Sequence, residues 1–313
     1  SYRVNPPVPR MIAALPLLID RPTVEWDAVD SPLDRSEFRF SHRWVTDNQS
    51  RLRVYLFRAR SMMLVFFALG LWSIFCWTRD LYGESAAIVA SLMWMFSPDT
   101  VTYASTVAPD LPAASAGLLV GYLFWRWLTT TSRPFPWTIA AAVGLAILCK
   151  FSWLFLLPVL PCIVLANDWL RHRDQLETEI RPDNQASGSR PPIVRDAVRL
   201  AVSFLLTIAM VNWAYGFDGT GTRLGEFQFV SQLLGGSDLP KGQVGNRFTD
   251  SKLAQIPVPL PAQMILGLDF LKYEFETGLP CYLRGTWQHK GWWYFYLYAM
   301  AVKTPAGYWA MIL

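Results

Sequence analysis

Seven long apolar runs constrain the fold of this chain more than any other feature of its sequence. They occupy residues 60–78, 84–98, 111–128, 137–149, 151–168, 197–215 and 292–313. Because a helix rises about 1.5 Å per residue, about 20 apolar residues cross the hydrocarbon core of a bilayer. The runs therefore predict an all-α integral membrane protein, a polytopic bundle with about seven membrane helices in this chain.

The composition agrees with the bilayer as the main solvent. Hydrophobic residues make up 52% of the chain and charged residues only 17%, a balance too apolar for a soluble domain of this length. The formal net charge of +4 is modest, and many arginines flank the apolar runs, so no nucleic-acid partner is expected. Three of the four cysteines lie inside apolar runs, which leaves no disulfide framework and no metal-binding spacing.

Long polar stretches between the runs predict structure outside the membrane. We expect an outer-face loop with a juxtamembrane helix (1–58), a transmembrane bundle (59–215) with a cytoplasmic linker (171–196), a partly helical outer-face loop region (216–291) and the start of a further membrane helix (292–313). Within the loop region, residues 267–275 carry apolar and charged positions at helical spacing and could form a helix that lies flat on the membrane.

Counting membrane crossings predicts which loops share a face. The stretch 137–169 is apolar except for Lys150, too long for one crossing and short of two full ones, so it predicts a hairpin of short helices with Lys150 at its apex. Prolines and aspartates make residues 99–110 a surface loop. The count then places that loop, the Lys150 apex and the two outer-face regions on one side. Because arginines in short loops mark the cytoplasm, residues 171–196 are expected inside and this shared face outside.

Three ionisable residues on or near the shared face are candidates for chemistry. Asp110 directly precedes an apolar run, where it either serves a reaction or caps a helix whose first turn contains Pro112. Lys150 and Lys303 lie within apolar surroundings, where a lysine either binds a ligand or extends to the membrane surface. Asp99 is expected in a turn, and the aromatic run 291–298 is typical of a membrane interface more than of sugar stacking.

Four stretches of the chain resemble one family in their sequence and order. They are YRVNPPVPRMIAALPLL (2–18), SPDTVTYASTVAPDLPAA (97–114), LAILCKFSWLFLLP (145–158) and YLRGTWQHKGWWYFYLYAMAVKTP (282–305). The chain resembles the superfamily of dolichyl-phosphate-mannose protein mannosyltransferases and aminoarabinose transferases, the phospholipid-carrier-dependent glycosyltransferases of the GT-C fold (glycosyltransferase family 39-like). The resemblance runs along nearly the whole chain.

The resemblance implies a function in the cell envelope. Such enzymes move a sugar, generally with inversion, from a polyprenyl-phosphate carrier to a hydroxyl of a protein, lipid or glycan acceptor on the extracytoplasmic face, here of a bacterial inner membrane. Asp110 matches the acidic position of the family's second outer loop and is assigned an auxiliary catalytic role. The substrate-binding candidates are Asn5, Arg10, Lys150, Arg284, His289 and Lys303.

Two features of the resemblance bear on completeness and subfamily. The family's principal acidic pair lies just before the stretch that matches residues 2–10, so the main acidic residue is expected upstream of Ser1 and the chain is expected to be a fragment. Asn5-Pro6-Pro7 lacks the histidine often found beside those prolines, which leaves the acceptor open. No cofactor is assigned, and a divalent metal stays open without a defined ligand set.

Two other classes of function stay open at this stage. Seven helices with intramembrane charges could line the pathway of a transporter or flippase, although the sequence shows no inverted repeat. A catalytically inert membrane scaffold of the same fold is the third alternative. An Asp-Glu pair upstream of Ser1, preceded by another apolar helix, would favour the enzyme over the scaffold.

Overall fold

The computed structural model describes residues 5–25, 36–130, 136–179, 193–237, 240, 243–289 and 291–312. These residues are mostly helical. The principal helices are α1 (Val8–Ala14), α2 (Leu17–Asp20), α3 (Ser36–Asp47), α4 (Leu52–Ser61), α5 (Leu64–Tyr82), α6 (Glu84–Phe96), α7 (Pro98–Ala104), α8 (Asp110–Thr129), α9 (Trp137–Cys149), α10 (Leu156–Glu179), α11 (Ile193–Ala214), α12 (Gln232–Gly235), α13 (Ala262–Thr277), α14 (Phe295–Lys303) and α15 (Ala306–Ile312).

Short elements join these helices. The 3₁₀-helices are η1 (Gln49–Arg51), η2 (Phe151–Phe155), η3 (Leu224–Glu226) and η4 (Lys252–Gln255). In the part of the chain that the structure describes, the two strands are β1 (Cys281–Leu283) and β2 (Thr286–Gln288), which pair antiparallel as a hairpin. The expected all-α character therefore holds, with one small hairpin between α13 and α14.

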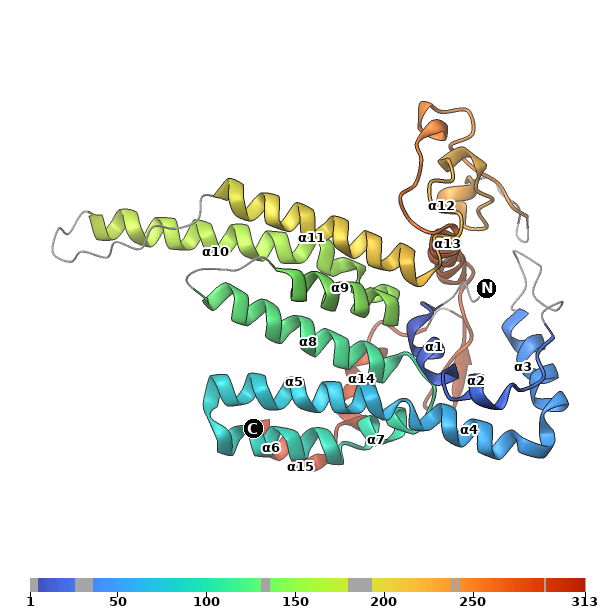
Figure 1. Ribbon diagram of the computed structural model, residues 1–313, viewed down its shortest axis with the longest axis horizontal. Coiled ribbons are helices and arrows are strands. Elements are labelled where there is room, and N and C mark those ends of the chain that lie inside the picture. The colour runs from blue at the N-terminus through green and yellow to red at the C-terminus, as the bar shows by residue number, and fades with distance from the viewer. Residues whose placement is uncertain are drawn as a thin grey trace.

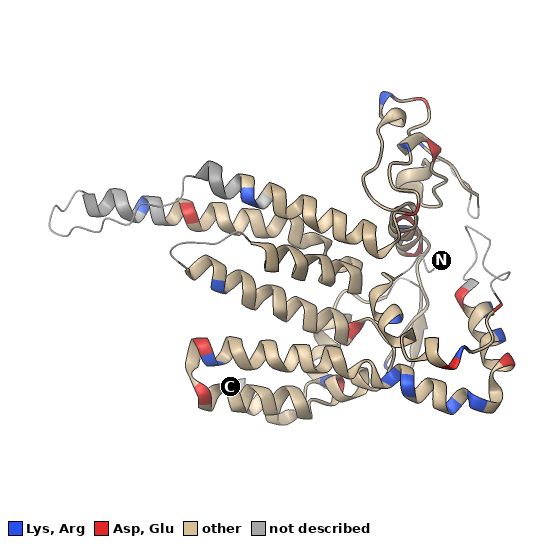
Figure 2. Cartoon of the chain, viewed as in Figure 1, with Lys and Arg blue, Asp and Glu red and all other residues tan. Residues whose placement is uncertain are grey.

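Long helices run side by side and form a bundle (Figure 1). Helix α5 packs against α6 and α8, α8 packs against α9, and α9 packs against α11. Lysine, arginine, aspartate and glutamate lie near the two ends of these helices, and the middle of the bundle carries almost none of them (Figure 2). This distribution is the one that a hydrocarbon layer imposes, because ionised side chains are costly inside it.

Two helices among the described residues are long and apolar enough to cross a membrane, Gln49–Tyr82 and Phe151–Leu170. Shorter apolar helices cover Glu84–Phe96, Trp137–Cys149 and Ala201–Ala214. The helical membrane-protein character is thus supported, while a total of seven crossings remains a prediction.

The loops that the crossing count assigned to one face lie together at one end of the bundle. Helices α1 to α4, helix α7, the end of α9 and the region around α12 and α13 occupy the right-hand end in Figure 1, and Lys150 directly follows α9. The turn at Gly83 between α5 and α6 lies at the opposite end. The linker residues 180–192 fall outside the described residues.

Three segments differ in detail from the sequence interpretation. The expected loop 99–110 begins with α7, because Pro98 suits the first helical position and Asp99 lies in the first turn. The last apolar run is divided into α14 and α15, since Thr304 is extended before Pro305. The stretch 267–275 is helical within α13, but it does not present its charges to water on one face, because the carboxylate of Asp269 is buried.

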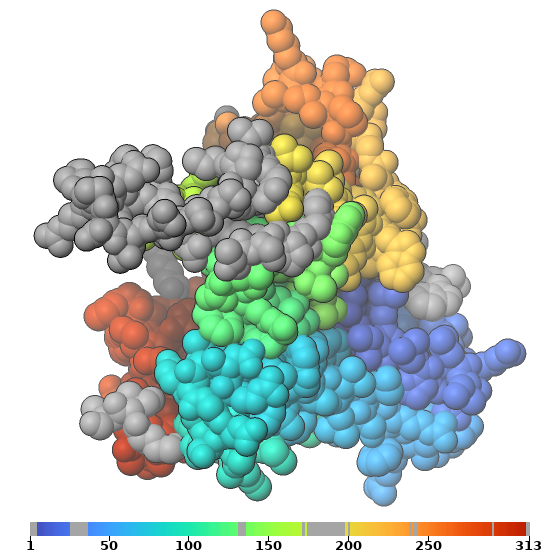
Figure 3. All heavy atoms as spheres, turned by 60° about the vertical axis from the view of Figure 1, so that its left-hand side comes forward, coloured from blue at the N-terminus to red at the C-terminus, as the bar shows by residue number. Residues whose placement is uncertain are grey.

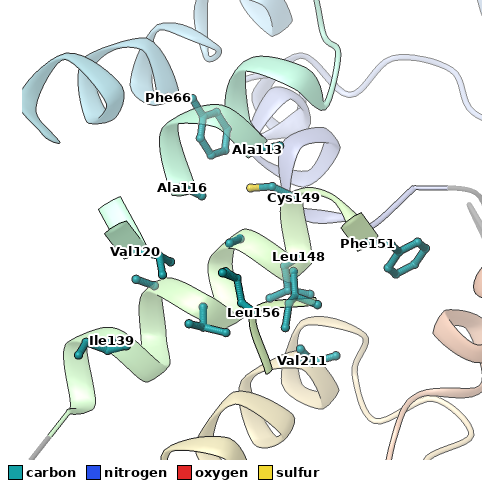
Figure 4. Packing of buried hydrophobic residues seen from close by; sticks show 14 of the residues in the cluster. Phe66, Ala113, Ala116, Val120, Ile139, Leu148, Cys149, Phe151, Leu156 and Val211 are labelled. Atoms are coloured by element: carbon teal, nitrogen blue, oxygen red, sulfur yellow. The ribbon is translucent and has the colours of Figure 1, made fainter. Parts of the chain in front are cut away.

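The core forms where α9 passes between α8 and α11. Figure 4 shows the side chain of Cys149 near Ala113 and Ala116 of α8, whereas Leu148 lies on the other side of α9 near Val211. Consecutive residues at the end of α9 therefore pack against different helices. This packing fixes the rotation of α9 immediately before Lys150.

Tryptophan rings lie against glycines on the helices of the bundle. A Cβ atom added at Gly117 or Gly121 of α8 would come within 2.1 Å of Trp153 or 2.7 Å of Trp77. Gly70 of α5 is covered in the same way, with a ring atom of Trp94 2.4 Å from the added Cβ. Each of these close contacts requires that the glycine carry no side chain.

The chain ends are tied to the bundle by polar contacts. The buried carboxylate of Asp20 pairs with Arg51 at 3.1 Å and with Arg58, which joins α2 to α4. The C-terminal helices lie against the α5 and α6 side of the molecule (Figure 3). There the hydroxyl of Tyr308 in α15 donates a hydrogen bond to the carbonyl of Met93 in α6.

Candidate functional site at the polar end of the bundle

Asp110 is the first residue of α8. The prolines at 109 and 112 flank it, and the backbone N–H of Ala113 donates to the carbonyl of Pro109 at 2.9 Å, which closes the first helical turn. A carboxylate in this position is stabilised by the positive end of the helix dipole. The side chain is 42% exposed, so the carboxylate remains accessible at the start of the helix.

Lys150 lies where α9 ends. Its backbone is extended (φ −156°, ψ 131°), and η2 follows directly. The neighbours on either side, Cys149 and Phe151, are buried at 0% and 6% exposure and anchor the turn in the core. Lys150 itself is 39% exposed, so its ammonium group emerges at the polar end of the bundle.

Asp110 and Lys150 form an ion pair. The Nζ atom of Lys150 donates to Oδ1 of Asp110 at 2.8 Å, although the two residues are 40 positions apart. The pair joins the start of α8 to the end of α9, two helices that pack side by side. The two residues that the sequence singled out on separate grounds are therefore in direct contact.

Trp153 of η2 contacts α8 close to this ion pair. Its indole Nε1 donates a hydrogen bond to the carbonyl of Ala113 at 3.0 Å, and its ring lies on Gly117 one turn further along α8. The sequence analysis did not single out Trp153. The available signal was a tryptophan three positions after Lys150, together with a glycine in the small-residue stretch of α8.

Arg10 lies on α1, which packs against both α4 and α9. One of its guanidinium nitrogens donates to the backbone carbonyl of Asn5, so these two candidates are in contact. Pro6 and Pro9 are buried and hold this segment against the bundle. The contact ties the residues just before α1 to the first turn of that helix.

A tyrosine just past the end of α11, Tyr215, lies in the field of Arg10. Its phenol is a hydrogen-bonding group at the end of this helix.

Arg284 and His289 lie on or beside the β-hairpin. Arg284 and Gly285 form its two-residue turn with positive φ values of 51° and 85°, and the Arg284 guanidinium lies 4.8 Å from the centroid of the Tyr298 ring. His289 is exposed after β2, and its carbonyl lies against Gly278 at the end of α13. Among the described residues, neither side chain has a hydrogen bond or ion pair to Asp110 or Lys150.

Lys303 is the last residue of α14 and its side chain is exposed. In the described ranges, no ion pair connects it to a carboxylate. The structure thus brings together Asp110 with Lys150 and Arg10 with Asn5, and it leaves Lys303 outside both contacts.

Further polar contacts hold the region around α12 and α13 in place. The carboxylate of Asp269, 1% exposed, accepts hydrogen bonds from the backbone N–H groups of Val230 at 2.6 Å and Ser231 at 3.2 Å. Glu276, two turns further along α13, accepts from the N–H of Gln232 at 2.7 Å and that of Leu233 at 3.3 Å. These carboxylates have structural partners and are not free for a substrate.

Neither a metal cluster nor an apolar cavity defines a second site. Across the described part of the chain, no group of three or more His, Cys, Asp or Glu side chains could hold a metal ion. A cavity of about 520 Å³ between α8, α9, α10 and α11 is lined almost wholly by apolar side chains. It includes neither Asp110 nor Lys150, so the candidate site is the ion pair and its surroundings.

The fold and site together define a class of protein: a helical membrane bundle with a partly exposed carboxylate–ammonium pair at its polar end. Residues 43–177 match the family model described as dolichyl-phosphate-mannose-protein mannosyltransferase, of the GT-C superfamily. The family resemblance seen in the sequence is confirmed over these residues, which include both Asp110 and Lys150. No curated protein and no solved structure matches the chain.

The family match supports the coarse features of the sequence interpretation. Members of this family are integral membrane proteins, and the match supports a membrane glycosyltransferase of the GT-C type. The sugar donor, the acceptor and the orientation in the membrane belong to the proposal below.

Proposed function

We propose that this chain is a membrane glycosyltransferase that binds a polyprenyl-phosphate sugar and directs transfer of the sugar to a hydroxyl acceptor on the extracytoplasmic face. The observation that carries the proposal is the 2.8 Å contact between Lys150 and Asp110 at the polar end of the bundle. Both residues lie within the family match at 43–177.

Lys150 supplies the positive charge for the carrier phosphate. Its ammonium group has three N–H donors, and one of them is used by Asp110, so two remain for phosphate oxygens. During transfer the bond from C1 of the sugar to the phosphate oxygen breaks, and its electron pair stays on the phosphate. A fixed cation at that oxygen stabilises the transition state more than the ground state, because the negative charge increases as the bond breaks.

Asp110 holds Lys150 in place and orients the acceptor. The acceptor oxygen forms the new bond to C1 and loses its proton to a carboxylate acting as general base. Asp110 is then an auxiliary group, because its Oδ1 is already the partner of Lys150 while its other oxygen can accept a hydrogen bond.

Arg10 is proposed as a second cation for the donor. It lies on α1, which packs against α9, the helix that ends at the Lys150 turn. Its contact with the Asn5 carbonyl fixes the guanidinium, a group whose N–H donors suit an anion. Arg284, His289 and Lys303 remain proposed substrate contacts. The Arg284 guanidinium already lies over Tyr298, and the other two side chains are exposed.

Sugar release from the lipid carrier tests this function directly. The full-length protein in membrane vesicles is given radiolabelled polyprenyl-phosphate hexoses, and label leaving the lipid phase is measured for wild type, Lys150→Gln and Asp110→Asn. Loss of one charge-stabilising contact lowers turnover by about a hundredfold or more. Because both side chains are about half exposed, each substitution is expected to alter the free energy of unfolding by less than about 1 kcal/mol.

Asp99→Asn is the matched control, since Asp99 is an exposed carboxylate in the first turn of the neighbouring helix α7. Its turnover should equal that of wild type. Unchanged turnover in both Lys150→Gln and Asp110→Asn would refute the assigned roles. Movement of the intact donor across the vesicle membrane, without cleavage of its sugar, would support a flippase instead, and neither activity would support an inert scaffold.

A further inference from the structure

One residue connects the Lys150 turn to the helix that carries Asp110. The indole of Trp153 donates to the Ala113 carbonyl, which lies three residues after Asp110 on α8. The same ring covers Gly117, where an added Cβ would come within 2.1 Å of ring atom Cζ2. Trp153 therefore contacts α8 through both a hydrogen bond and close packing.

Backbone hydrogen bonds connect Trp153 to Lys150 and Lys150 to α9. The N–H of Trp153 donates to the Lys150 carbonyl at 3.1 Å, and the N–H of Lys150 donates to the Ala146 carbonyl at 3.0 Å. Lys150 thus lies between a helix end fixed by Cys149 and a turn fixed by Trp153. The half-exposed ion pair is too weak to hold this geometry alone, because exposed pairs contribute about 1 kcal/mol or less.

We propose that Trp153 is a positioning residue that sets the place of the Lys150 ammonium group relative to Asp110. The inference rests on the function proposed above. The side chain of Trp153 does not meet the substrate. It acts through Lys150 by keeping η2 pressed onto α8, so that the ammonium group reaches both Asp110 and the carrier phosphate.

Trp153→Phe removes the indole N–H and the outer ring atoms that lie on Gly117, while keeping an aromatic side chain in η2. A displacement of about 1 Å can cost a hundredfold in rate, so sugar release per folded protein is expected to fall by about tenfold to a hundredfold. In the Lys150→Gln background the same substitution should lower release by less than about twofold, because the group that it positions is gone. A general structural role would instead lower release equally in both backgrounds, and that result overturns the proposal.

Two glycine variants provide a matched comparison on α8. Gly117→Ala places a methyl group against Trp153, and Gly121→Ala places one against Trp77, four residues further along the same helix. Both substitutions disturb a tryptophan contact, but only the first touches the Lys150 turn. Gly117→Ala should lower sugar release, and Gly121→Ala should leave release per folded protein unchanged. Equal activity of the two variants contradicts the positioning role.

A measurement without turnover separates this inference from the proposed function. Hydrogen exchange of the Lys150 and Trp153 amides reports on the turn itself, and both should exchange faster in Trp153→Phe than in Gly121→Ala. If wild type releases no sugar, the proposed function fails while exchange still tests the positioning. If Lys150→Gln abolishes release but Trp153→Phe changes neither release nor exchange, only the positioning role fails. Should Trp153→Phe not fold, Gly117→Ala replaces it, and its effect on sugar release is compared in the wild-type and Lys150→Gln backgrounds.

Discussion

Replacing Asp269 by asparagine is expected to open the loop segment that rests on α13. The Asp269 carboxylate is 1% exposed and accepts from the N–H groups of Val230 at 2.6 Å and Ser231 at 3.2 Å. Asparagine has nearly the same shape but only one acceptor oxygen. Its amide group cannot accept from the second N–H, which is left buried without a partner.

The size of the effect follows from those two contacts. A hydrogen bond to a charged acceptor contributes about 1.5–3 kcal/mol, and a buried donor without a partner costs about 1–3 kcal/mol. These two terms overlap, so the net change in the free energy of local opening is about 2–4 kcal/mol. The population of the open segment then rises by about 30-fold to 900-fold.

Limited proteolysis of the full protein in detergent measures that population. Trypsin cleaves after Arg247 and Lys252, whose side chains are exposed. Their backbone is folded, since the N–H of Arg247 donates to the Leu234 carbonyl at 3.0 Å, so cleavage requires that the segment open. When opening and closing are fast relative to cleavage, the cleavage rate is proportional to the open population. Asp269→Asn should therefore speed cleavage at both sites by at least about 30-fold.

Glu276→Gln is the matched control, because Glu276 also accepts from two backbone N–H groups of this segment but its side chain is 18% exposed. Water can replace a lost contact there, so its cleavage rate should rise by less than about tenfold. If Asp269→Asn is cleaved no faster than Glu276→Gln, burial of the Asp269 carboxylate does not hold the segment, and the reasoning is wrong.

Two shorter predictions concern the ends of the chain and its orientation. Asp20→Asn weakens the contacts with Arg51 and Arg58 and should lower the free energy of unfolding by about 1.5–3 kcal/mol. The change is measured as a lower midpoint of thermal unfolding. An unchanged midpoint would show that packing alone holds α2. A membrane-impermeant maleimide added to intact cells should label Cys281 near the hairpin but not Cys149, which is 0% exposed. Labelling of Cys281 only after permeabilisation would reverse the proposed orientation.

The placement of Asp110 and Lys150 at the same end of the bundle could be anticipated from the sequence, because it depends on chain direction alone. Antiparallel neighbouring helices bring the start of one beside the end of the other, and both residues lie at such ends. The breaks at Pro98 and Pro305 were equally visible as prolines in the sequence. Their effect on helix boundaries was not, because proline can either begin a helix or follow the end of one.

Contacts that depend on side-chain register in three dimensions could not be read in this way. The pattern of residues 267–275 is the same for a helix on a membrane surface and for one that buries Asp269 under a backbone segment, and only the position of residues 230–231 decides between them. The contact of Trp153 with Gly117 likewise depends on how far η2 lies along α8. Neither a buried aspartate nor a tryptophan has a preferred partner at a fixed distance along the sequence.

The tryptophan–glycine contacts of the bundle predict a pattern of joint substitution among related sequences. At Gly70 and Gly121 the space that a side chain would need is filled by the rings of Trp94 and Trp77. A larger residue at either glycine is compatible with this spacing of helices only if the facing tryptophan becomes smaller at the same time. Relatives that retain the bundle should therefore vary at both members of each pair or at neither, and a glycine replaced alone should mark a shifted helix.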